Sequence, residues 1–227
     1  MIYSEFVNIL THPRMYRYHA ACGGDSMKTM TLYRLNLKLA GEFLSVVSFL
    51  EISFRNTVNN HCLSALGNDW LRDGANAGGI FDNLNCRETA NAINEAILFL
   101  NGGYTHNKLV AELGFGFWRY MFAKNQYAAT GKILLSIFPA HPATTLTFNF
   151  NQDFVFNQLK NINNLRNRIA HHEPICFIPR STVKSATYAR QHYHLILQLL
   201  QWMSIDDRAL LYGVDHIINV CNQIDAL

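Results

Sequence analysis

The stretch that decides the fold is LYRLNLKLAGEFLSVVSFLEISFRNTV, residues 32–58. Its apolar residues recur every three or four positions, which places them on one face of a single long helix. We expect the helix to begin at a Ser26 cap and to stop at Gly67, with Gly41 as the point where it would bend or divide. The apolar series is Leu32, Leu35, Leu39, Phe43, Val46, Leu50, Phe54 and Val58.

Helical periodicity extends through most of the remaining chain, and TTLTFNF (144–150) is a weak strand candidate. The long helix before Pro174 is expected to end there, because the residue before a proline disfavours the α region. The sequence therefore predicts an all-α fold, with residues 1–227 forming a single helical domain. Further helices are predicted over 87–100, 105–113 with a Thr105 cap, 127–138, 152–172, 182–203 and after a capping-box-like Ser-Ile-Asp-Asp at 204–207.

Composition narrows the class of protein. Of 227 residues, 49% are hydrophobic and 15% charged, so the chain can bury a sizeable core and is not typical of disordered proteins. The formal net charge of +3 permits an anionic partner without requiring one. Five scattered cysteines without a CxxC pair favour a reducing, cytoplasmic compartment. No secretory signal and no membrane span are expected, because no long uninterrupted apolar run occurs.

The segment NLRNRIAHHEPI (164–175) gathers two arginines and two histidines beside a proline. This chemistry suits a phosphodiester. A neutral imidazole can accept the proton of an RNA 2′-hydroxyl, and a guanidinium can stabilise the charge that grows on the phosphorane oxygens. Arg166 and His171 lie ~140° apart on an ideal helix, so they would converge only at its end. His172 is expected to face a different direction from His171, so that one histidine enters any given site.

Spacing decides how specific this signal is. A loose Arg-x(4–6)-His pattern arises by chance roughly 1.6 times in a chain of this composition, and we interpret Arg14…His19 as such a match. Requiring Asn after Arg, with His at the sixth position, lowers the chance expectation to roughly 0.05. Arg166, Asn167 and His171 satisfy the stricter pattern.

LRNRIAHHEP resembles the RNxxxH signature of HEPN domains, in particular the Abi-like (abortive infection) family. Segments 32–61, PRMYRY (13–18) and GFGFWRYMF (114–122) are also similar to segments of that family. The resemblance implies a HEPN-like helical bundle with additional helices. It also implies a metal-independent endoribonuclease, without cofactor, acting in phage defence. HEPN nucleases usually act as homodimers with a composite active site. The implied catalytic residues are Arg166, Asn167 and His171, with His172 as an auxiliary imidazole and Arg168 contacting RNA.

A second Arg-Asn pair occurs in LEISFRNTVNNH (50–61). Three interpretations stay open. Glu51 and Arg55 could form a structural ion pair at i,i+4. Glu51, Arg55 and Asn56 could support Arg166 and His171, as outer residues orient the ligands of a metal site. The segment could also be a second catalytic motif, although His61 sits one residue too late.

Residues 151–200 hold six Lys/Arg against two acids, which favours an anionic ligand, although solvated helix faces would also explain it. A metal shared by His192 and His194 is disfavoured by their spacing. The aromatic residues of 114–122 are interpreted as core rather than as a base-stacking surface. Two other function classes compete with the nuclease. One is a non-catalytic RNA- or nucleotide-binding partner in a defence or toxin–antitoxin complex, and the other is a structural dimerisation bundle.

Overall fold

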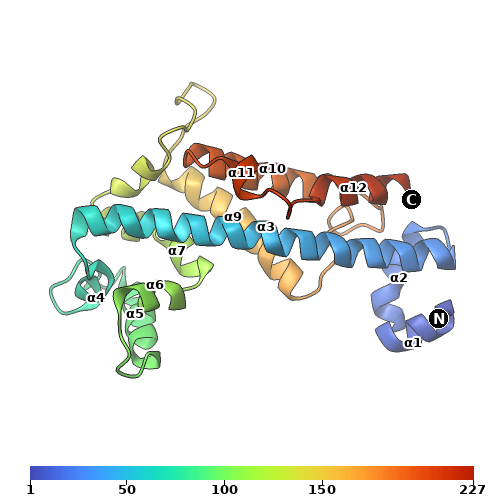
Figure 1. The fold of residues 1–227 in the computed structure, drawn as a ribbon, viewed down its shortest axis with the longest axis horizontal. Helices are drawn as coiled ribbons and strands as arrows, with labels where there is room; N and C mark the ends of the chain where they lie inside the picture. The colour runs from blue at the N-terminus through green and yellow to red at the C-terminus, as the bar shows by residue number, and fades with distance from the viewer. The chain divides into compact units, whose positions relative to one another are not determined.

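The computed structural model describes residues 1–227 and confirms an all-α fold. It has twelve α-helices, one 3-10 helix and no strand (Figure 1); an isolated antiparallel bridge joins Phe177 and Lys184. The resemblance to HEPN bundles stays a prediction. The elements are α1 (Tyr3–Leu10), α2 (His12–Ala21), α3 (Ser26–Leu66), α4 (Trp70–Ala75), α5 (Arg87–Phe99), α6 (His106–Glu112), α7 (Phe115–Tyr120), α8 (Lys124–Ala129), η1 (Ile133–Ile137), α9 (Gln152–Ala170), α10 (Thr187–Trp202), α11 (Asp207–Leu210) and α12 (Ile217–Ala226).

The chain divides into two compact units, each assembled from separate segments. Helices α3, α9 and α10 contribute residues to both units. The expected single domain therefore stays a prediction. Unit 1 comprises Met1–Ser48, Asn164–Gln198 and Asp207–Leu227, and unit 2 comprises Phe49–Asn163 and Leu199–Asp206.

Helix α3 follows the apolar series predicted for it. All but one of the eight predicted core positions are buried, and Leu35 is half-buried. The cap is Asp25 rather than Ser26, since its Oδ1 accepts from the backbone N–H of Lys28 at 2.9 Å. The helix runs through Gly41 without a break and ends before Gly67, whose φ of +102° favours glycine.

The core of unit 2 is aromatic. Phe115, Trp118 and Phe122 are buried, as predicted for segment 114–122, whereas Tyr120 is 50% exposed. Phe54 on α3 packs against Phe115, Phe122 and Phe138 with ring centroids 5.6–6.5 Å apart. Trp70 packs edge-on against Trp118, whose indole N–H donates to the carbonyl of Leu113. These rings are buried, and each such pair contributes about 0.5–1.5 kcal/mol beyond its buried area.

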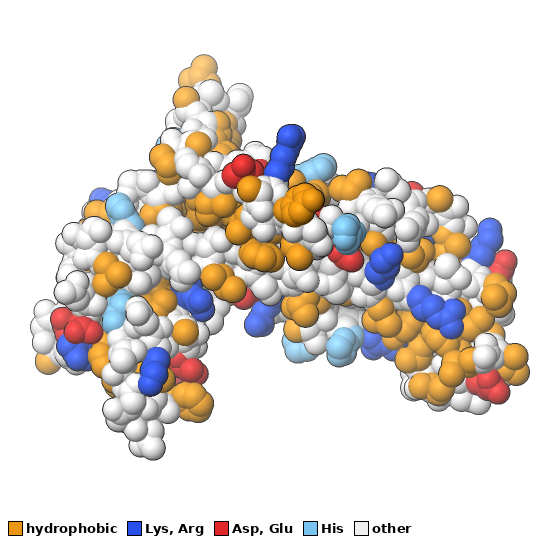
Figure 2. Space-filling model, in the orientation of Figure 1, with side chains coloured by type: hydrophobic (Ala, Val, Ile, Leu, Met, Phe, Trp, Pro, Cys, Tyr) orange, Lys and Arg blue, Asp and Glu red, His pale blue; other side chains and the backbone are white.

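The core of unit 1 surrounds two tyrosines. Tyr18 on α2 contacts Tyr33 on α3 and Phe177, both at 5.1 Å between centroids. Phe6 on α1 packs edge-on against Tyr33 at 5.6 Å. The exposed residues of α1 are polar apart from Ile9, which is 66% exposed. Figure 2 shows hydrophobic side chains gathered over this N-terminal region. This core fixes α2 beside the segment that follows α9.

Two predicted helices and one predicted strand differ in the structure. The predicted helix over 127–138 is broken, because Gly131 and Lys132 both have positive φ. The predicted start of α10 at 182 is five residues early, because Lys184 pairs with Phe177 and the N–H of Ser185 donates to the carbonyl of Cys176. The weak strand candidate at 144–150 is a loop.

Candidate functional site

The C-terminal end of α9 is a Schellman turn. The helix ends at Ala170, two residues before the predicted end. The N–H of His172 donates to the carbonyl of Ile169 at 2.9 Å, and the N–H of Glu173 donates to the carbonyl of Arg168 at 2.8 Å. His172 occupies the left-handed position, with φ +55°, where glycine is the usual residue. The turn therefore holds a residue with a side chain where the backbone favours none.

Arg168 holds this turn closed. Its Nε lies 3.2 Å from a carboxylate oxygen of Glu173, and its Nη2 donates to the carbonyl of Pro174 at 2.6 Å. Its guanidinium also lies 4.7 Å from the ring centroid of Tyr188. The two ends of a Schellman turn are often joined by a hydrophobic contact, and here an ion pair takes that place. Direct RNA contact by Arg168 stays a prediction, whereas its contacts within the protein give it a positioning role.

Helices α2 and α3 hold the turn from the other side. Arg14 Nη2 donates to the carbonyl of His172 at 2.7 Å, and Arg14 Nε donates to the Tyr33 hydroxyl at 3.2 Å. The buried N–H of Ile175 donates to Asn36 Oδ1 at 2.9 Å. The turn is thus fixed by hydrogen bonds that involve neither imidazole.

His171 and His172 line one open cleft of about 510 Å³. The sequence predicted that one histidine enters any given site, whereas both residues line this cleft; the backbone at His172 is left-handed, with φ +55°. Both residues are exposed, and neither imidazole forms a hydrogen bond. The cleft is lined by Thr11, Pro13, Arg14, Arg17, Tyr18, His171, His172, Glu173 and Pro174.

Arg14 and Arg17 were not predicted as site residues, and both line this cleft. Arg17 donates from Nε to the carbonyl of Ser181 at 2.6 Å and from Nη2 to the carbonyl of Ile178 at 2.9 Å. Its guanidinium stacks 4.4 Å from the ring centroid of Phe177. Burial lowers the pKa of Arg17, and the charge of Arg168 adds to that effect. An arginine nevertheless stays protonated at physiological pH.

Arg166 and Asn167 lie near the C-terminal end of α9 and are exposed. The lining of the histidine cleft does not include them. This agrees with the ~140° that separates positions five apart on a helix. The structure thus brings His171, His172 and two unpredicted arginines together and places the Arg-Asn part of the motif outside that lining.

Glu51, Arg55 and Asn56 belong to the part of α3 in unit 2, whereas the RNxxxH motif belongs to unit 1. Glu51 and Arg55 are half-buried, and Arg55 Nε lies 3.5 Å from Asn56 Oδ1. Their proposed supporting role stays a prediction. His61 forms a hydrogen bond between its Nε2 and the Ser136 hydroxyl at 2.9 Å.

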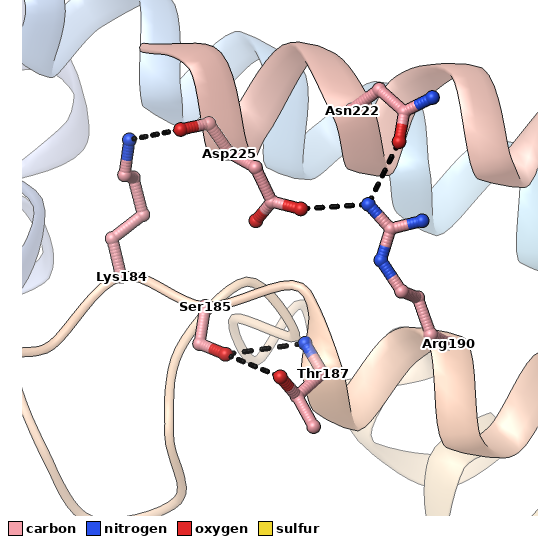
Figure 3. A network of polar contacts seen from close by, with 6 residues as sticks. All are labelled: Lys184, Ser185, Thr187, Arg190, Asn222 and Asp225. Atoms are coloured by element: carbon pink, nitrogen blue, oxygen red, sulfur yellow. Dashed lines mark hydrogen bonds and ion pairs between the residues drawn. The ribbon is translucent and has the colours of Figure 1, made fainter.

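Part of the basic charge near the motif is engaged in holding the fold (Figure 3). Arg190 on α10 donates to Asp225 at 2.7 Å and to Asn222 at 2.9 Å, both on α12. Lys184 lies 3.4 Å from the carbonyl of Asp225. Together with the Arg168–Glu173 pair, these contacts account for three of the six basic residues of segment 151–200 without a ligand.

The histidines of α10 do not form a metal cluster. His192 Nδ1 forms a hydrogen bond with the carbonyl of Tyr188 at 2.8 Å, and burial lowers its pKa. No group of three or more His, Cys, Asp or Glu side chains is placed to hold a metal ion.

Comparison of the chain with protein-family models, with curated proteins and with solved structures gave no match.

None of the helices combines the length and apolar character that crossing a membrane requires.

Proposed function

We propose that this chain is a metal-independent endoribonuclease of the HEPN type, acting in phage defence. One observation carries the proposal. His171 and His172, whose imidazoles have no hydrogen-bond partners, line the same open cleft as Arg14 and Arg17, whose guanidiniums pair with no carboxylate. Titratable rings beside uncompensated positive charge suit general acid–base chemistry on a phosphodiester.

His171 accepts the proton of the 2′-hydroxyl, and the resulting oxygen attacks the adjacent phosphorus. The bond from phosphorus to the 5′-oxygen breaks, and protonated His172 donates a proton to that leaving oxygen. The products are a 2′,3′-cyclic phosphate and a 5′-hydroxyl, and no metal is needed to balance the reaction. In this scheme Arg166 stabilises the phosphorane charge and Asn167 orients a phosphate oxygen.

The strained backbone at His172 supports a role for its ring. A non-glycine residue in the left-handed region costs about 1–2 kcal/mol, and such residues concentrate at functional sites. Glycine would close the same turn without that cost. The chain therefore carries a histidine at a position whose backbone favours glycine.

A homodimer would complete the site. Arg166 and Asn167 lie outside the lining of the cleft that holds His171 of the same chain. A second copy could present these residues to that cleft, as the resemblance to HEPN nucleases implies. A mixture of catalytically dead His171→Ala and Arg166→Ala chains would then regain part of the activity, because one of its two composite sites is intact.

The test is cleavage of a mixed RNA panel in EDTA. We expect cyclic-phosphate and 5′-hydroxyl ends, and a loss of about 10²–10⁴-fold in rate for His171→Ala. His194→Ala is the matched control, because His194 is another histidine of unit 1 that does not line the cleft. Equal cleavage by His171→Ala and the unaltered chain would remove His171 from the mechanism. Tight, salt-sensitive RNA binding without cleavage would instead favour a non-catalytic RNA-binding module.

A further inference from the structure

The guanidiniums of Arg14 and Arg17 are fixed in place by neutral acceptors. These two residues lie three positions apart on α2, so they share one side of the helix. Each guanidinium uses Nε and Nη2 to donate to backbone carbonyls or to the Tyr33 hydroxyl. A guanidinium has five N–H donors, so three on each arginine, including both of Nη1, remain available.

The positive charge of the two arginines is not neutralised within the cleft. Neither forms an ion pair, since their acceptors are uncharged oxygens. Glu173 is the one acidic residue in the lining, and its carboxylate is paired with Arg168 at 3.2 Å. Two like charges in one cleft repel each other, and an anion bound in that cleft lowers this cost.

The start of α2 adds to the positive potential. Thr11 and Pro13 line the cleft, so this end of the helix borders it. The first turn of α2 holds no acidic residue, and its N-cap makes no side-chain hydrogen bond. The partial positive charge of a helix N-terminus disfavours a cation such as Arg14 and favours an anion.

We propose that Arg14 and Arg17 bind a backbone phosphate of single-stranded RNA, next to the phosphodiester that reaches His171 and His172. This inference rests on the proposed function and assigns a phosphate site to residues outside the RNxxxH motif. The forked, planar donors of arginine match phosphate oxygens, and their anchored edges keep them oriented before RNA arrives. The site holds the strand; the proton transfers belong to the histidines.

The test is binding of a 2′-O-methyl RNA oligonucleotide, which lacks the nucleophilic hydroxyl and so cannot be cleaved. The logarithm of the association constant is measured against the logarithm of salt concentration. The slope is negative, and each lost phosphate contact reduces its magnitude by about 0.7 for a single strand. We expect that reduction for Arg14→Gln and for Arg17→Gln. Arg34→Gln is the matched control: Arg34 is an exposed arginine of the same unit that stacks on Phe6, and its loss should leave the slope unchanged.

A second measurement needs no variant and so does not depend on folding. Phenylglyoxal modifies accessible arginines, and mass spectrometry locates the products. The RNA oligonucleotide should protect Arg14 and Arg17 several-fold more than Arg34. A methylphosphonate oligonucleotide of the same sequence, which lacks the phosphate charge, should not protect them.

The outcomes separate this inference from the proposed function. Unchanged slopes in both variants, or equal modification with and without RNA, overturn the phosphate site even if the chain cleaves RNA. The expected slopes and protection in a chain that cleaves no RNA support the phosphate site and refute the nuclease. A chain that neither binds nor cleaves RNA refutes both.

Discussion

The left-handed turn at His172 allows backbone strain to be separated from side-chain chemistry. His172→Ala and His172→Gly both remove the imidazole, and both keep the backbone carbonyl that accepts from Arg14. They differ in the conformational preference of the residue at φ +55°. Relief of the left-handed conformation favours glycine by about 1–2 kcal/mol, and the greater freedom of glycine in the unfolded chain opposes this by about 0.5–1 kcal/mol. We expect His172→Gly to be more stable than His172→Ala by about 0.5–1 kcal/mol.

Urea unfolding followed by circular dichroism measures this difference. The midpoint should rise from the alanine to the glycine variant with an unchanged m value, and the melting temperature should rise by about 1–4 °C. A glycine variant no more stable than the alanine variant would refute the assignment of a strained Schellman turn. Cleavage assays on the same two variants then test the His172 imidazole. An equal loss of cleavage rate in both assigns that loss to the missing imidazole, whereas activity retained by only one variant assigns it to the backbone.

Further predictions concern the buried groups. Asn59 Oδ1 accepts from the Trp70 indole N–H at 3.0 Å and forms a hydrogen bond with His106 Nε2 at 2.7 Å, so Asn59→Ala should lower the free energy of unfolding by about 2–3 kcal/mol in urea titrations. Burial lowers the pKa of His106, so the unfolded chain binds its proton first; stability should fall as pH drops from 7 towards the lowered pKa, and His106→Gln should flatten the dependence. Iodoacetamide at pH 8 should modify the half-buried Cys22 first, since the other four thiols are buried and burial raises the pKa of Cys62 to about 12; a different first product in peptide mapping would contradict this.

The long helix could be predicted from the sequence because its evidence is local. Eight apolar residues that recur every three or four positions are typical of a helix and not of a strand. The Thr105 cap of α6 is also local, because its hydroxyl accepts from the N–H of Lys108. The start of α10 could not be predicted in this way. Residues before it have helical propensity, but Phe177 and Lys184 pair across a loop, and such pairing overrides propensity.

The candidate site also has parts that local sequence predicts and parts that it does not. His171 and His172 were found because the motif is contiguous, and their shared cleft was missed because an ideal helix was extended through a residue that is left-handed. The signal for that turn was present in the sequence: a proline follows two residues later, which is typical of a helix that has already ended. Asn or Gly at position 172 would have made the turn easier to predict.

Arg14 shows why spacing statistics could not complete the site. The loose Arg14…His19 match has no catalytic geometry, because His19 stacks on Tyr3 and forms a hydrogen bond with Thr29. Arg14 instead reaches a carbonyl 158 positions later in the chain. That bond fixes the turn carrying both imidazoles, while the remaining donors of the same guanidinium border their cleft. Arg14 both holds the turn and lines the cleft, so binding of a phosphate at Arg14 would be coupled to the geometry of the histidines. A sequence pattern within one segment cannot predict this coupling, because the two residues that form the bond lie far apart in the chain.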